Sequence, residues 1–207
     1  MKRLLGSVLL LSVSVGTPAQ DVLECEKRPG KPPATPLGAG YITKISPILT
    51  CKAEIDDRTA CNVFLGRALK VLFDNKDFAT GKDSYMLAND IAHGLANSAA
   101  SLGWSKVGNA SDQTALDKAQ AYANAGRAVV AARKGIAKAD GTVGPGHVVL
   151  IMPGQTEVYS AKDFGWNNLS TPNSASVFLN APARTYLSCP LSASWKKPDG
   201  VEIFVKN

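Results

Sequence analysis

Three side chains stand out as groups that could carry out nucleophilic chemistry: the thiol of Cys61 and the imidazoles of His93 and His147, the two histidines of the chain. A cysteine nucleophile needs a base to take its proton, and histidine is the usual base near neutral pH. Cys61 stands near the start of TACNVFLGRALKVLF, residues 59–73, whose apolar residues have the i, i+3, i+4, i+7 spacing of an amphipathic helix. We therefore predict a helix with Cys61 in its first turn, capped by Thr59 or the aspartates before it. Unpaired backbone N–H groups and the helix dipole there favour the thiolate.

The two histidines differ in their surroundings. His147 opens the apolar run HVVLIM directly after Gly144-Pro145-Gly146, and glycines at the mouth of a strand leave room for a substrate and for an approaching helix end. His93 falls in a second predicted helix, from about residue 85 to 98, and points away from its apolar face, as a surface residue would. We predict that Cys61 pairs with His147, with an ordinary strand-end histidine as the alternative for His147.

The four cysteines are Cys25, Cys51, Cys61 and Cys189. If all four pair, two disulfides form in one of three connectivities. If Cys61 is a catalytic thiol, at most one disulfide can form among the others, and we favour Cys51 with Cys189. The state of Cys61 therefore separates an enzyme from a disulfide-bonded structural protein.

The remaining pattern predicts helices first and strands afterwards. A third helix is expected over 112–124, with Ser111 or Thr114 as its cap and Gly126 at its end. Strands are expected at 127–132, 148–152 and 156–161, then near 176–179, 183–187 and 201–206, while the residues around Trp104 are expected to form a loop. Because Pro153-Gly154-Gln155 separates the second and third of these strands, we predict that they form a hairpin. Helices followed by an antiparallel sheet indicate the α+β class.

Length and composition indicate one globular domain behind an export signal. The chain has 207 residues, 19% charged and 45% apolar. Residues 1–19 read as a signal peptide cleaved before Gln20, with an uncleaved anchor as the alternative, so we expect a periplasmic or secreted protein without stable membrane insertion. Residues 20–50, rich in Pro and Gly, are expected to form an extended arm, with a disordered linker as the alternative, and residues 51–207 the folded domain.

The charge balance excludes some classes of partner. Two of the six net positive charges come from Lys2 and Arg3 in the expected signal. The remaining excess suits a polyanionic surface such as a cell envelope, but it is too small and too evenly spread to indicate nucleic-acid binding. The histidines and cysteines have no zinc-ligand spacing and the glycines form no phosphate-binding loop, so we expect neither a metal nor a cofactor.

Two short motifs resemble a known family. Thr59-Ala60-Cys61-Asn62-Val63-Phe64 and Gly146-His147-Val148-Val149 are similar to the cysteine and histidine motifs of the NlpC/P60 and CHAP-type papain-like peptidases. The resemblance spans residues 59–206 and implies N-terminal helices packed on an antiparallel sheet. The cysteine then begins a helix and the histidine begins a strand. The chain departs from the family where Ala60-Cys61-Asn62 replaces the common Asp-Cys-Ser.

The resemblance also implies a third polar residue on the strand after the histidine, where it orients the imidazole. About a dozen residues past His147 this position falls on Ser160, which we predict to be the third catalytic residue. Glu157, Asp163 and Asn167 are nearby competitors, and a Cys–His dyad without a strong third member is a further alternative.

The function implied by the resemblance is hydrolysis of amide bonds in peptidoglycan stem peptides through a Cys61 thioester. Some similar proteins are antibacterial amidase effectors of type VI secretion systems, which implies an immunity protein as a partner. We expect a monomer. The competing interpretations are a papain-like peptidase acting on another substrate and a non-catalytic, disulfide-bonded envelope or wall-binding protein with Cys61 in a bridge.

Overall fold

The computed structural model describes residues 35–49, 60–82, 84–158, 165–167, 169–178 and 185–207. Among these residues, a six-stranded sheet with strand order β1-β8-β2-β3-β6-β7 forms the centre of the molecule, and every neighbouring pair in it is antiparallel. Its strands are β1 (Trp104–Asn109), β2 (Val129–Arg133), β3 (His147–Ile151), β6 (Asn173–Ser176), β7 (Tyr186–Pro190) and β8 (Glu202–Lys206). Together with the helices, this sheet confirms the predicted α+β class.

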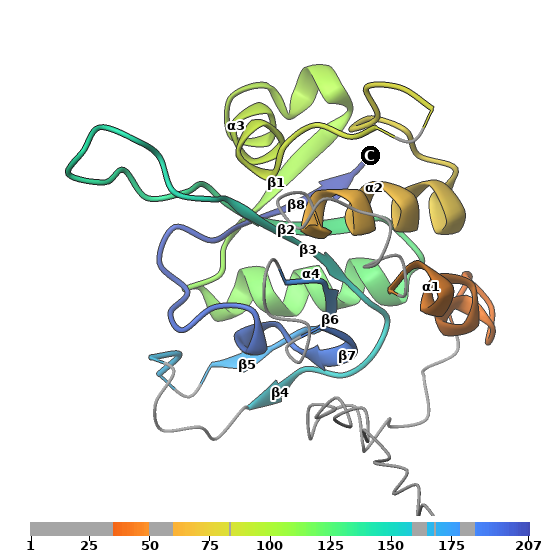
Figure 1. Ribbon diagram of the computed structural model, residues 1–207. Coiled ribbons are helices and arrows are strands. Elements are labelled where there is room, and N and C mark those ends of the chain that lie inside the picture. Colours follow the sequence, from red (N-terminus) through yellow and green to blue (C-terminus); the bar gives the residue numbers. More distant parts are fainter. Residues whose placement is uncertain (1–34, 50–59, 83, 159–164, 168, 179–184) are drawn as a thin grey trace, which may run out of the picture.

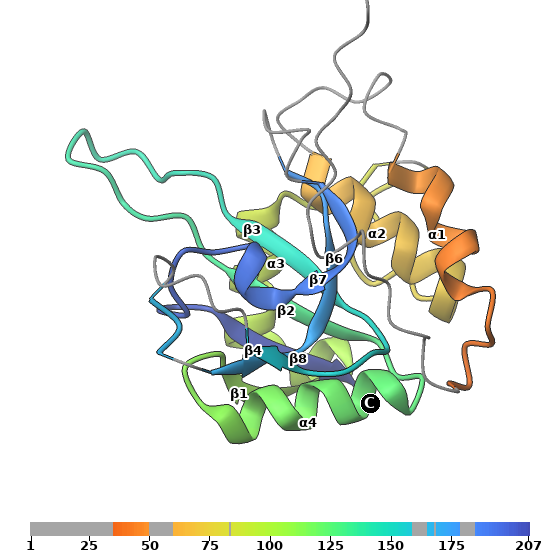
Figure 2. The ribbon, with the colours of Figure 1, turned by 90° about the horizontal axis from the view of Figure 1, so that it is seen from below.

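Helices cover both faces of the sheet (Figures 1 and 2). They are α1 (Tyr41–Leu49), α2 (Ala60–Phe73), α3 (Ala88–Ser98) and α4 (Gln113–Asn124), with 3-10 turns η3 (Ala100–Leu102) and η5 (Leu191–Ala193). The helices α1, α2 and α3 share one apolar core with Val130 and Leu150, and α4 shares a second core with Val129 and Ile151. Successive strand residues point to opposite faces, so burial of both faces explains why β2 and β3 are almost continuously apolar. No helix within the described ranges is both long enough and apolar enough to cross a membrane.

The three predicted helices are confirmed, with small shifts at their ends. The helix that carries Cys61 begins at Ala60, and α3 begins at Ala88 rather than at residue 85. The cap of α4 is Asp112, whose carboxylate accepts a hydrogen bond of 2.9 Å from the backbone N–H of Thr114, and not Ser111 or Thr114. Gly126 ends the helix as predicted, with a φ of 77° that favours glycine.

The predicted hairpin between residues 148–152 and 156–161 is wrong. Strand β3 pairs with β2 and β6, whereas β4 (Glu157–Val158) pairs with β5 (Ser170–Thr171) in a separate two-stranded sheet. Two side chains of α4 hold the chain where it leaves β3. Gln120 donates to the carbonyl of Met152 and accepts from the N–H of Asn173, and Asn124 bonds both backbone groups of Gly154. These hydrogen bonds give partners to backbone groups of the turn and bring β6 beside β3.

Two further elements differ from expectation. Residues 41–49, in the predicted extended arm, form α1, whose Tyr41 hydroxyl donates to the Pro153 carbonyl at 3.0 Å. The predicted loop around Trp104 is the edge strand β1, which pairs with β8. The outer strands β6 and β7 each lie about three residues from their predicted positions. Helix α1 forms because Tyr41 and Ile45 are buried in the core, a contact that composition does not reveal.

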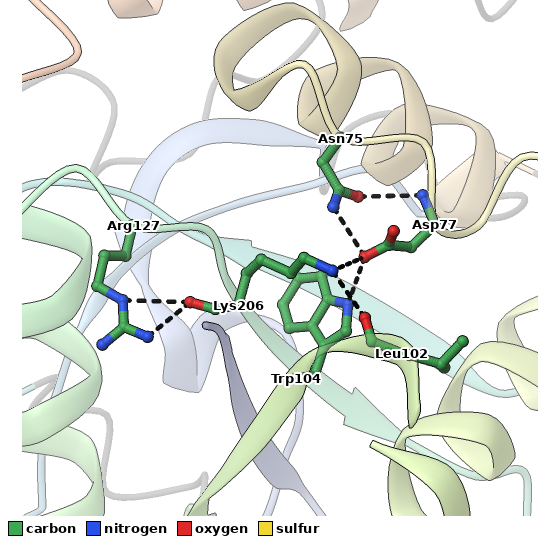
Figure 3. Close-up of polar contacts among 6 residues, drawn as sticks. All are labelled: Asn75, Asp77, Leu102, Trp104, Arg127 and Lys206. Carbon is green, nitrogen blue, oxygen red and sulfur yellow. Dashed lines mark hydrogen bonds and ion pairs between the residues drawn. The ribbon is translucent and has the colours of Figure 1, made fainter. Parts of the chain in front are cut away.

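A polar cluster joins the loop after α2 to the last strand (Figure 3). Asp77 accepts hydrogen bonds from Asn75 at 2.8 Å, from the indole N–H of Trp104 at 2.8 Å and from the ammonium group of Lys206 at 2.7 Å. Lys206 also donates to the carbonyl of Leu102, and its own carbonyl accepts from Arg127. Partial burial raises the pKa of the Asp77 carboxyl, but the hydrogen bonds and the lysine charge outweigh it, so the pKa is lowered.

We expect Asp77→Asn to destabilise the protein by about 1–3 kcal/mol near neutral pH, because Lys206 loses a charged acceptor and the indole of Trp104, itself 1% exposed, loses part of its hydrogen bonding. Thermal or urea unfolding of both proteins measures the difference. A lowered pKa stabilises the fold above the ordinary carboxyl range, so the difference should shrink as the pH falls below about 4.

The ion pair between Lys106 and Glu202 supplies a matched control on the neighbouring strands β1 and β8. The Lys106 side chain is 48% exposed, and exposed pairs contribute little. Lys106→Ala should therefore cost no more than about 1 kcal/mol. Equal losses for Asp77→Asn and Lys106→Ala would contradict the role assigned to the Asp77 cluster.

Candidate active site

Cys61 is a free thiol in the first turn of α2, and only 7% of the residue is exposed. Burial is the main influence on this group and raises the pKa of the thiol, while hydrogen bonds to the backbone of Val148, Asn62 and Cys61 lower it and do not compensate. The expectation that the helix start favours the thiolate is therefore corrected. The amides are in place, but the low-polarity surroundings penalise the charged form more strongly.

The packing of α2 explains why this thiol meets the start of β3. Phe64 and Leu65 lie in the core that also contains Val148 and Leu150, so the helix lies across the middle of the sheet. Asn62, which is 1% exposed, donates a 2.7 Å hydrogen bond to the carbonyl of Met86. The asparagine that follows Cys61 therefore has a structural role, because it anchors the first turn of α2 to the segment that leads into α3.

His147 is the first residue of β3, as predicted, and its ring is held from several sides. Its Nε2 lies 3.0 Å from the hydroxyl oxygen of Ser176 on β6. The ring stacks on Phe178 with centroids 4.7 Å apart, and it meets the ring of Trp195 edge-on at 5.3 Å. These contacts restrict the orientation of the imidazole. The Val148 amide donates a hydrogen bond to the thiol of Cys61, so Cys61 lies beside the residue that follows His147.

Gly146, directly before His147, allows the close approach of α3. A methyl group at Gly146 would lie 2.5 Å from the side-chain oxygen of Asn89 and 3.0 Å from its backbone nitrogen. Asn89 in turn donates to the carbonyl of Gly144 at 3.0 Å and accepts from the N–H of Gly135 at 2.7 Å. The asparagine thus joins both ends of the loop between β2 and β3, which projects from the body of the molecule (Figures 1 and 2). The start of α3 therefore occupies part of the space predicted beside His147, and Gly146 and His147 also line a pocket.

The hydroxyl group beside the imidazole of His147 belongs to Ser176, which is not among the residues predicted for the third catalytic position. Ser176 is fully buried and bonds His147 because β6, and not the segment after Gly154, lies next to β3. The predicted Ser160 and its competitor Asp163 lie outside the described residues. Glu157 and Asn167 are exposed and do not line the pocket of Cys61 and His147. Ser176 lay at the start of a predicted strand, but nothing in the local pattern indicated which strand would pair with β3.

The other predicted assignments concern His93 and the disulfides. His93 is exposed on α3 and contacts Asn97 one turn later, so its prediction as a surface residue is confirmed. Cys189 is disulfide-bonded, whereas Cys25 and Cys51, its predicted partner, lie outside the described residues. In the described part of the chain, no three His, Cys, Asp or Glu side chains gather as a metal-ligand group.

Cys61 and His147 line one pocket of about 320 Å³. Apolar surface comes from Leu87, Phe178 and Trp195, and polar groups come from Asn89 and Arg133. Such a mixture suits a ligand with a hydrophobic body and a few polar groups. A buried thiol, a histidine oriented by a hydroxyl and an adjacent pocket together form the arrangement that acyl transfer through a cysteine requires.

Comparison of the chain with protein-family models, with curated proteins and with solved structures finds no match.

Proposed function

We propose that this protein is a papain-like cysteine hydrolase of the NlpC/P60 type that cleaves amide bonds in peptidoglycan stem peptides after export. The observation that carries the proposal is the shared pocket of Cys61 and His147, where the thiol accepts a hydrogen bond from the Val148 amide and Ser176 bonds the imidazole. The cysteine and histidine motifs noted above support the substrate class. The free thiol of Cys61 disfavours the alternative of a binding protein with Cys61 in a bridge.

The first chemical step is proton transfer from Cys61 to His147. When the Nε2–H of His147 donates to Ser176, Nδ1 carries the lone pair and can accept the thiol proton. The raised pKa of Cys61 favours a neutral thiol in the free protein, so deprotonation coincides with attack on the substrate carbonyl. His147 therefore acts as a general base. It does not form a thiolate–imidazolium pair with Cys61 before the substrate binds.

The later steps use the same groups. The backbone N–H of Cys61, at the start of α2, can donate to the oxyanion that forms when sulfur attacks the carbonyl carbon. His147 then gives its proton to the leaving amine, and the C–N bond breaks to leave a thioester. Water attacks the thioester with His147 again as the base, releasing the carboxylic acid and restoring the thiol.

A digest of purified peptidoglycan tests the proposal. The exported protein and its Cys61→Ala variant are incubated with sacculi, and the released fragments are identified by mass. New stem-peptide fragments from the wild type alone would support the hydrolase and identify the bond. The absence of such fragments with the folded wild-type protein would refute it, and equal fragments from both proteins would refute Cys61 as the nucleophile.

We expect Ser176→Ala to lower kcat/KM by about 3- to 10-fold, because one neutral hydrogen bond to His147 is lost while the base itself remains. Initial rates on a defined stem peptide measure the effect. Ser174→Ala is the matched control, since Ser174 is an equally buried serine of β6 that bonds Tyr186 and the Cys189 carbonyl. A loss of activity in Ser174→Ala as large as that in Ser176→Ala would indicate a general effect of packing in β6.

A further inference from the structure

The pocket of Cys61 and His147 continues into a second and larger pocket of about 1160 Å³. The two pockets share Arg133, Ser194 and Trp195, so these residues lie at the junction. The second pocket adds the exposed lysines Lys134, Lys196 and Lys197 together with the acids Asp199 and Glu202. The two adjoining pockets are called the groove below. A ligand that reaches the thiol and extends along the groove passes Arg133.

Arg133 is placed beside the reacting groups by strand register. It is the last residue of β2 and lies directly opposite His147 on β3, so the two side chains leave the same face of the sheet as close neighbours. Its guanidinium lies over the ring of Trp195, 5.9 Å from the centroid, and its stem passes Gly200, where a methyl group would be 3.8 Å away. Arg133 is therefore half-buried and held at one end of the catalytic pocket.

The guanidinium of Arg133 interacts with the ring of Trp195 and with the charge of Asp199, but it has no direct polar partner in the described part of the fold. Within the described residues its guanidinium forms no ion pair within 4.0 Å and donates no hydrogen bond. Arg127 differs, since it donates two hydrogen bonds to the Lys206 carbonyl. Burial lowers the pKa of Arg133 and the charge of Asp199 acts against this, but an arginine remains cationic.

A second donor without a partner lies at the same junction. Within the described residues the indole N–H of Trp195 is buried and has no acceptor, and the whole residue is only 3% exposed. Buried donors without acceptors are unfavourable and uncommon in native proteins. Of these two groups, the half-buried guanidinium of Arg133 is the one that a ligand in the groove can reach, so this part of the groove suits a ligand group rich in acceptors.

We infer that Arg133 binds a carboxylate of the substrate next to the scissile amide, so that the preferred substrates are peptides with a free carboxylate at that position. The inference rests on the proposed function. A planar guanidinium matches a carboxylate through two parallel hydrogen bonds, and no other common peptide group uses it so fully. The exposed lysines of the second pocket also favour a negative charge in the ligand.

Two synthetic stem peptides that differ in one group test the inference. Both have the same sequence, but the residue next to the cleaved bond carries a free carboxylate in one and a carboxamide in the other. The wild type should cleave the carboxylate peptide about 10- to 100-fold more efficiently in kcat/KM. Arg133→Gln should lose this preference by slowing on the carboxylate peptide alone, and Arg133→Lys should retain part of it.

Lys138→Gln is the charge-matched control, because Lys138 is exposed on the projecting loop and lines neither pocket. It should keep the full preference. Equal cleavage of both peptides by the wild type, or an equal loss on both peptides in Arg133→Gln, would overturn the inference. The comparison of peptides on the wild type remains decisive even if Arg133→Gln does not fold.

Binding to the Cys61→Ala variant separates this inference from the proposed hydrolysis. Titration calorimetry with both peptides should show tighter binding of the carboxylate peptide, again by about 10- to 100-fold, and Arg133→Gln should remove the difference. If the wild type cleaves neither peptide but this preference is present, hydrolysis fails and the role of Arg133 is supported. Equal binding of the two peptides, or no binding of either, overturns the role of Arg133.

Discussion

Replacing Cys61 by alanine should lower kcat/KM for stem-peptide hydrolysis by at least about 10⁴-fold, because no other group in the pocket can form the thioester. The fold should survive, since one buried sulfur is removed from the end of a helix whose other contacts remain. We expect a stability loss of about 1–2 kcal/mol. Initial rates by fragment analysis and thermal unfolding measure the two effects separately.

Cys61→Ser is the control for this substitution, since it keeps the size of the side chain but supplies a much poorer nucleophile. It should be as inactive as Cys61→Ala. Alkylation of the wild-type thiol should accelerate with pH beyond the ordinary cysteine range near 8.5, because the raised pKa keeps the thiol protonated to higher pH. Hydrolysis within 10-fold of wild type in Cys61→Ala would exclude the thioester mechanism.

His147→Ala should lower kcat/KM by about 10³-fold or more, whereas His93→Ala should leave it unchanged. His147 lies in the pocket and, in the proposed mechanism, takes part in each proton transfer, while His93 is exposed on α3. Because the pKa of Cys61 is raised, little thiolate exists near neutral pH without a base. The residual rate of His147→Ala should therefore increase as the pH rises, and a pH profile of both variants checks this.

His147→Gln separates the loss of the base from the loss of packing. The imidazole contacts Phe178 and Trp195, so alanine also leaves a gap that glutamine partly fills. Both variants should be equally inactive, although His147→Gln should be the more stable of the two. An inactive His93→Ala with an active His147→Ala would show that the pairing of Cys61 with His147 is wrong.

The local features of the fold were predictable from short-range patterns. The helix of Cys61 is visible in the i, i+3, i+4 spacing of Phe64, Leu65 and Ala68, which are the residues that the structure buries. The strand of His147 is visible as an apolar run after glycines, and this run is buried on both faces. In each case the spacing of the apolar residues reflects their burial, because those residues face the apolar core on which the element packs.

Strand pairing was not predictable from such patterns. A turn at Pro153-Gly154 favours a hairpin locally, but Gln120 and Asn124 of α4 bond the backbone there and divert the chain. These contacts join residues about thirty positions apart in the sequence. Trp104 illustrates the same limit, because its strand is an edge strand with mostly polar, partly exposed residues and its pairing depends on β8 at the end of the chain.

The sequence by itself determined the two side chains that are proposed to react, because a cysteine in the first turn of an amphipathic helix and a histidine at the mouth of an apolar strand are local properties. The tertiary structure decided which groups surround these side chains. It placed Ser176 beside His147, raised the pKa of Cys61 through burial, and set Arg133 opposite His147 at the junction of two pockets. Each of these properties arises from contacts between residues that are distant in the chain, and their energies appear only when the core has formed.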